Sequence, residues 1–189
     1  MSDFYEALLL KNVKSDFTHV SLDSENHESM IHSNKEVIDF DKVKELYVDE
    51  RKLENAPKSI DGLFKEADDK YVFVEFKNGV IRSDTRKELR EKAFHSIVML
   101  SDICGQPCCW IRKHVSYVLV FNPDKNKEAV ERSKKQAGVS DSFSFDQITS
   151  TVNSYAGNNY PMFDLNLLQK FAFEKVYSLS PDEFIRKFI

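Results

Sequence analysis

Three residues in the middle of the sequence, Asp61, Glu75 and Lys77, have the chemistry of a metal-assisted phosphate site. Two neighbouring carboxylates form a hard oxygen site suited to Mg²⁺ or Mn²⁺. A lysine beside them can neutralise charge on a phosphate or help to orient a water molecule. The sequence therefore offers Asp61 and Glu75 as metal ligands and all three residues as catalytic groups, provided that the fold brings them together.

A β-hairpin would bring these residues together. Two segments with the composition of strands, residues 59–64 and 71–76, flank a short polar turn. Because side chains alternate along a strand, Glu75 and Lys77 point to one face and their apolar neighbours to the other. Pairing of the two strands places Asp61 close to Glu75, so we expect one polar cluster on one face of a sheet.

The charged pair has an alternative explanation. A strand covered by helices has no place for an exposed Glu and Lys, so Glu75 and Lys77 must lie at a strand end, compensate one another or bind a ligand. An edge strand that simply holds both side chains in water satisfies the same pattern. The position of this strand within the sheet decides between the two interpretations.

The other segments predict the elements that hold this hairpin. Residues 84–104 have the clearest helical pattern, because their apolar positions step by three or four along one face. A buried strand is expected at residues 116–121. Further elements are expected as helices at residues 3–13, 41–53 (with Asp41 as its cap) and 125–136, a polar and peripheral section at 138–161, a strand at 171–179, and a last helix after a capping box at Ser180.

These elements predict a single α/β domain that spans residues 1–189. Its mixed central sheet carries helices on both faces. We expect the core at about residues 41–121 and a peripheral C-terminal extension at about 122–189.

The order of these features resembles the core of the PD-(D/E)xK nucleases. Asp61, a spacer of thirteen residues, the segment Glu75-Phe76-Lys77, a long amphipathic helix and an apolar strand follow one another over residues 41–121. The resemblance implies a restriction-endonuclease-like fold, with Asp61 and Glu75 as metal-binding acids, Lys77 as the catalytic lysine, and Mg²⁺ or Mn²⁺ as the cofactor. It also implies hydrolysis of nucleic-acid phosphodiester bonds. Ile60 stands where the motif nominally has proline.

The full chain is also similar to uncharacterised bacterial proteins that carry KSIDGLF and EFKNG segments, and this second resemblance implies no activity. Members of the nuclease superfamily often add an acid from the helix before the first strand. Glu45 and Glu50 are both candidates for that acid.

Cations for binding nucleic acid are offered by Arg86, Lys87 and Arg90. A solvated helix face is the alternative explanation for this basic run. The net charge of −4 removes the strongly basic field of a nonspecific nucleic-acid coat, so local cations would have to bind any phosphate. The acidic charge equally permits a noncatalytic relative that keeps the nuclease-like fold and binds a protein or nucleic acid.

Other classes of function have less support. The sequence has no GxxxxGK[ST], GxGxxG or GxSxG motif, which argues against nucleotide hydrolysis, dinucleotide redox chemistry and a serine-hydrolase site. It also has no apolar run long enough to span a bilayer, and its acidic N-terminus does not resemble a secretory signal. Its three closely spaced cysteines, Cys104, Cys108 and Cys109, suit a reducing compartment, so we expect a cytoplasmic protein.

Overall fold

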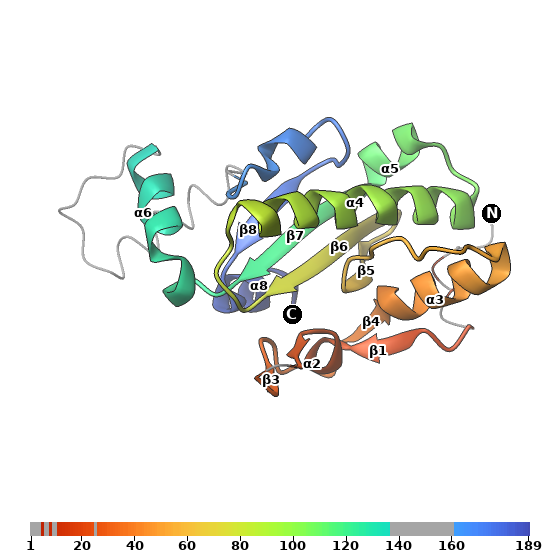
Figure 1. Ribbon diagram of the computed structural model, residues 1–189, viewed down its shortest axis with the longest axis horizontal. Coiled ribbons are helices and arrows are strands. Elements are labelled where there is room, and N and C mark those ends of the chain that lie inside the picture. Colours follow the sequence, from red (N-terminus) through yellow and green to blue (C-terminus); the bar gives the residue numbers. More distant parts are fainter. Residues whose placement is uncertain (1–4, 6–7, 9–10, 25, 137–160) are drawn as a thin grey trace.

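The computed structural model describes residues 5, 8, 11–24, 26–136 and 161–189. Its centre is a mixed sheet of six strands, as the sequence predicts (Figure 1). Across the sheet, the first four strands are antiparallel to their neighbours, and the fourth, fifth and sixth strands are parallel to one another. In spatial order the strands are β1 (Lys14–Asp16), β4 (Glu36–Asp39), β5 (Gly62–Ala67), β6 (Lys70–Lys77), β7 (Val115–Phe121) and β8 (Val176–Leu179).

Helices cover both faces of this sheet. The longest, α4, crosses one face, and α8 lies behind the sheet in Figure 1. A separate two-stranded sheet, β2 (Leu22–Asp23) with β3 (Glu28–Ser29), lies near the N-terminus. The helices are α2 (Phe17–Val20), α3 (Phe40–Arg51), α4 (Ser83–Cys104), α5 (Cys108–His114), α6 (Lys127–Gln136) and α8 (Pro181–Phe188), with short 3-10 helices η1 (Asp124–Asn126) and η2 (Leu165–Leu168).

Two hydrophobic cores lie on opposite faces of the sheet. On the α4 face, the buried side chains Leu89, Ala93 and Leu100 pack with the sheet, which confirms the apolar stripe predicted for this helix. On the other face, the rings of Phe17 and Phe184 pack edge to face at 5.3 Å between centroids. Burial of such aromatic rings is a large source of stability, so the sheet is fixed from both sides.

The predicted hairpin is confirmed by the register of β5 and β6. Gly62 pairs with Val74, so the chain immediately before β5 runs beside Glu75. A Cβ atom at Gly62 would lie 2.9 Å from Val37 Cγ2 and 3.1 Å from Val74 Cγ1. Glycine therefore lets three strands approach closely where Asp61 enters the sheet.

The C-terminal segment is not peripheral, and this prediction is wrong. Strand β8 pairs in parallel with β7, and Leu165, Phe173 and Phe184 are buried in the two cores. The parallel partner of β8 is a distant segment of the chain, so local patterns did not indicate this pairing. The predicted strand at residues 171–179 is also too long, because only Val176–Leu179 forms it and Phe171 is exposed.

Smaller corrections concern helix ends. Asp39, not Asp41, caps α3, since the Asp39 side chain accepts a hydrogen bond from the Lys42 backbone N–H. The short helix α5 was not predicted. The capping box at Ser180 is confirmed, with both reciprocal hydrogen bonds to Glu183 present.

Two predictions lie largely outside the described residues, the helix at 3–13 and the polar section at 138–161. Within the described part of the chain, no helix is long and apolar enough to cross a membrane.

Candidate functional site

Asp61 and Glu75 converge on the ammonium group of Lys92, which projects from α4. The Lys92 Nζ atom lies 2.6 Å from Glu75 Oε1 and 3.3 Å from Asp61 Oδ1. The two carboxylates are therefore much closer than about 8 Å, the largest separation that one metal site tolerates with an intervening water. The predicted convergence of Asp61 and Glu75 is confirmed.

This triad is almost removed from solvent. The Glu75 side chain is 0% exposed, and those of Asp61 and Lys92 are 19% and 18% exposed. Strand β6 lies between two neighbours in the centre of the sheet. The alternative of a solvated edge strand is therefore wrong for Glu75.

Three residues on α4 hold the segment that carries Asp61 in place through hydrogen bonds and an ion pair. The Ser96 Oγ accepts a hydrogen bond from the Ile60 backbone N–H at 3.0 Å. The preceding residue is His95, whose Nδ1 accepts a hydrogen bond from the Lys58 backbone N–H at 3.0 Å, and Glu91 pairs with the Lys58 side chain at 2.9 Å. Lys92 lies on the same part of the helix, four positions before Ser96, which explains why it reaches the carboxylates.

The four carboxylate oxygens have different environments. Asp61 Oδ2 accepts a hydrogen bond of 2.6 Å from the Phe76 backbone N–H, which fixes the orientation of the Asp61 carboxylate. Glu75 Oε2 is buried and has no hydrogen-bond partner among the described residues. The buried Tyr117 hydroxyl on the neighbouring strand also has none there. A buried carboxylate oxygen without a partner is costly, so Glu75 Oε2 is a candidate contact for a bound group.

Burial and mutual repulsion alter the protonation of the site. Burial, together with the nearby Asp61 charge, raises the pKa of Glu75 well above its usual value. Burial also raises the pKa of Asp61. Burial alone would lower the pKa of Lys92, but the Glu75 and Asp61 carboxylates outweigh it and raise that pKa. The Lys92 ammonium therefore stays charged and partly offsets the repulsion between the Asp61 and Glu75 carboxylates.

A cavity of about 640 Å³ gives access to the triad. It is bordered by Asp61, Glu75 and Lys92 and also by residues of α3 and of the β2–β3 region. Of its described lining residues, six are acidic and three are lysines, so these walls carry an excess of negative charge. A cation is the ligand that this excess favours most directly.

The other predicted site residues are only partly assembled here. Lys77 borders the same cavity, and its charge acts to lower the Glu75 pKa. Of the two candidate additional acids, Glu45 borders the cavity, whereas Glu50 does not and pairs with Lys11 at 2.9 Å. Among the described residues, no three His, Cys, Asp or Glu side chains are grouped closely enough to hold a metal ion. Asp61 and Glu75 therefore offer two carboxylates to an ion, without a third acidic, His or Cys ligand among the described residues.

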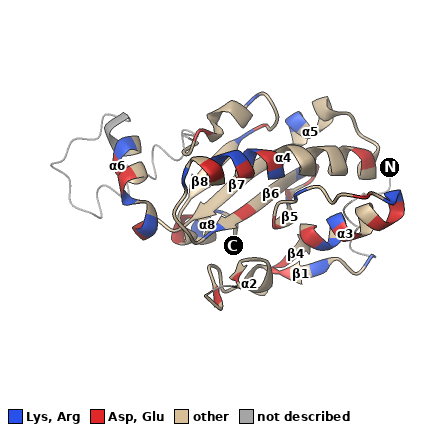
Figure 2. Ribbon diagram, in the orientation of Figure 1, with Lys and Arg blue, Asp and Glu red and all other residues tan. Residues whose placement is uncertain are grey.

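The predicted nucleic-acid-binding cations, Arg86, Lys87 and Arg90, do not line this cavity. Arg86 pairs instead with Asp164 at 2.9 Å, on another side of α4. In the view of Figure 2, acidic and basic residues alternate along α3, α4 and α6. Basic residues on these three helices are therefore interspersed with acidic ones in that view.

Lys92 is the functional residue that the sequence prediction missed. It lies three positions after Leu89 and four before Ser96, so it borders the predicted apolar face of α4. A lysine beside an apolar face needs a partner for its charge, but this pattern does not show which acid provides it.

Comparison of the sequence with protein-family models found no matching family, and comparisons with curated proteins and with solved structures found no similar protein.

Proposed function

We propose that this protein hydrolyses phosphodiester bonds in nucleic acid with the help of a divalent metal ion at Asp61 and Glu75. One observation carries the proposal: two buried carboxylates converge at the wall of a cavity, and one oxygen of Glu75 has no partner in the described part of the chain. Lys92 provides one positive charge for two acids, and Glu75 Oε2 still has no partner among the described residues, so a bound cation would stabilise the pair further.

The residues fit Mg²⁺ or Mn²⁺. Both are hard cations that prefer carboxylate oxygens, and Mg²⁺ is commonly held by only one or two carboxylates, with water and substrate phosphate completing its shell. Asp61 Oδ1 and both oxygens of Glu75 would hold the ion. The chemistry that such an ion supplies is stabilisation of charge on a phosphate and activation of a water nucleophile.

The two lysines would act on different charges. Lys92 contacts both carboxylates and would favour their ionised forms, against the effect of burial, before the ion binds. Lys77 follows Glu75 by two positions on β6 and borders the cavity, so its ammonium is available to a phosphate oxygen of the substrate. Lys77 would then neutralise charge that grows in the transition state.

The order of elements supports assignment to the restriction-endonuclease-like fold and the PD-(D/E)xK superfamily. Asp61 immediately precedes β5 and Glu75 lies on β6, α4 follows this hairpin in the chain and covers one face of the sheet, and β7 returns parallel to β6. We propose the cytoplasm as its location, in keeping with three cysteines that form no disulfide.

The Lys92 ion pairs favour a second candidate function. A lysine already lies between the two acids, and it can serve as their permanent counterion. In that case the chain is a noncatalytic protein that retains the core and binds a protein or nucleic-acid partner. The two candidates differ in whether a metal ion and a substrate ever enter the site.

Incubation with nucleic acid tests the proposed reaction. We expect the wild-type protein to cleave at least one of single-stranded DNA, duplex DNA, branched DNA and RNA in Mn²⁺, and to cleave none of them in chelator. Asp61→Asn should remove cleavage because it removes a ligand charge, whereas Asp49→Asn on the exposed side of α3 should not. Inactivity of a folded wild-type protein on every substrate would favour the noncatalytic function.

A further inference from the structure

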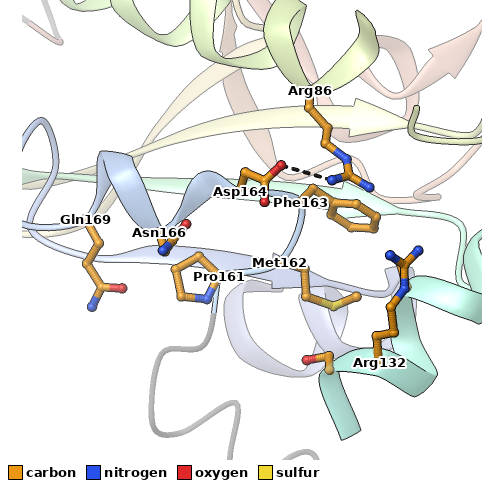
Figure 3. A pocket seen from close by; sticks show the side chains of 10 residues that line it. Arg86, Arg132, Pro161, Met162, Phe163, Asp164, Asn166 and Gln169 are labelled. Atoms are coloured by element: carbon orange, nitrogen blue, oxygen red, sulfur yellow. Dashed lines mark hydrogen bonds and ion pairs between the residues drawn. The ribbon is translucent and has the colours of Figure 1, made fainter. Parts of the chain in front are cut away.

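A second polar pocket, of about 480 Å³, lies between α4, α6 and the segment around η2. Figure 3 shows the guanidinium groups of Arg86 and Arg132 reaching toward the same part of this pocket, beside Phe163. Arg86 comes from the first turns of α4 and Arg132 from α6. The pocket therefore brings together two cations that are far apart in the sequence.

Arg86 is only partly satisfied by its neighbours. Its Nη1 donates to Asp164 Oδ2 at 2.9 Å. Its Nε is buried and has no acceptor among the described residues. A guanidinium carries five N–H donors, and an unmatched buried donor is costly. Arg86 is thus held in place by Asp164 and retains capacity to bind an anion.

Arg132 is held more loosely. Its Nε donates to the Glu128 backbone carbonyl at 3.3 Å, and its Nη2 lies 4.0 Å from the Glu128 carboxylate. That carboxylate is 95% exposed, so water screens the pair strongly. The terminal N–H groups of Arg132 are therefore available to a ligand.

The rest of the lining suits an anion attached to a larger group. Asp164 is the only acidic side chain among the described residues that line the pocket, so the two arginines leave an excess of positive charge there. Ser133, Asn166 and Gln169 add neutral hydrogen-bonding groups. Met162 and Phe163 add an apolar surface, and the Phe163 ring is fixed by an edge contact with Phe121 at 5.0 Å.

This pocket is separate from the carboxylate site. Among the residues that the structure describes, none lines both cavities. Arg86 and Lys92 lie six positions apart on α4, which places them roughly 120° apart around the helix axis. Binding in the pocket therefore does not require a metal ion at Asp61 and Glu75.

We propose that this pocket binds a phosphomonoester through Arg86 and Arg132. A phosphate dianion offers three acceptor oxygens, which match the planar forks of two guanidinium groups better than a single carboxylate does. The apolar side formed by Met162 and Phe163 accommodates the organic group that carries the phosphate. A free nucleotide and the 5′-phosphate end of a nucleic acid share this chemistry.

Calorimetric titration in chelator and at low ionic strength tests this site independently of metal. The probes are a nucleoside 5′-monophosphate, a 5′-phosphorylated oligonucleotide and the same oligonucleotide with a 5′-hydroxyl. We expect a phosphorylated probe to bind and the hydroxyl form to bind at least about tenfold more weakly, with affinity falling as salt rises. Preference for the oligonucleotide over the monophosphate identifies a nucleic-acid end as the source, and the reverse identifies a free nucleotide.

A matched pair of variants on one helix completes the test. Arg132→Gln should weaken phosphate binding by about tenfold or more, because a charge-assisted contact is lost. Lys127→Gln removes the same charge from an exposed position on α6 that does not line the pocket, and should leave the affinity within about twofold. Equal losses in both variants, or no binding of either phosphorylated probe by the wild-type protein, would overturn the proposal.

Discussion

Lys92→Met should lower the free energy of unfolding by about 3–5 kcal/mol at neutral pH, because it leaves two buried carboxylates without their cation. Lys92 contacts both Asp61 and Glu75, and its side chain is 18% exposed. Methionine keeps much of the apolar stem and removes the charge. Unfolding in urea measures the loss directly.

The loss should depend on pH in a defined direction. Burial raises the folded-state pKa of Glu75 above 4.5 and that of Asp61 above 3.8, so each acid binds its proton more tightly in the folded state. Their contribution to stability therefore falls as pH rises from these ordinary values through the raised folded values. Lys92 acts against this loss of stability. Its pKa is raised in the folded state, so its contribution to stability is present at neutral pH and is lost only as the pH rises through that raised pKa. The Lys92→Met variant lacks this stabilising positive charge. It should therefore be least destabilised near pH 4, where the acids are largely protonated, and most destabilised above neutrality.

Lys58→Met is a suitable control for this experiment. Lys58 also pairs with a glutamate of α4, Glu91, but both side chains are nearly half exposed. Exposed pairs contribute little to stability, because water screens them. A Lys92→Met loss no larger than that of Lys58→Met, or one that does not change with pH, would contradict the description of the triad as a buried charge cluster.

Lys77→Ala should reduce cleavage by about 10²–10³-fold while nucleic-acid binding remains. An interaction made mainly in the transition state lowers turnover without an equal loss of ground-state affinity. Lys77 borders the cavity beside Glu75, which suits contact with a reacting phosphate. Single-turnover cleavage in Mn²⁺ and retention on a filter in chelator separate the two effects.

Lys175→Ala serves as the matched control for Lys77→Ala, since Lys175 is exposed and outside the cavity. Its cleavage rate should equal that of the wild-type protein. Parallel losses of binding and cleavage in Lys77→Ala would assign Lys77 to substrate binding rather than to the transition state.

The hairpin and its acids could be predicted because their signals are local. Alternation along residues 71–77 places Glu75 on the face opposite to Val74 and Phe76, and the short polar turn fixes the pairing with β5. The α4 stripe is likewise a pattern within one helix. Such patterns require no knowledge of distant partners.

The contacts of Lys92 and the pairing of β8 could not be predicted because both depend on segments that are distant in the sequence. Lys92 reaches Glu75 only because α4 crosses the sheet in one orientation, with Ser96 fastened to Ile60. A strand was predicted where β8 lies, but its local pattern does not show that it pairs in parallel with β7. The ion pair of Arg86 could not be predicted for the same reason, since its partner Asp164 lies 78 positions later in the sequence.

The central claim is that Asp61 and Glu75 bind a divalent cation rather than serving only as partners of Lys92. Thermal unfolding of the wild-type protein with increasing Mn²⁺ tests it most directly, because an ion that binds only the folded state raises the melting temperature by mass action. We expect the melting temperature to rise with Mn²⁺ in the wild-type protein and in Asp49→Asn, and not to rise in Asp61→Asn. An unchanged response in Asp61→Asn, or no response in the wild-type protein, would contradict the claim.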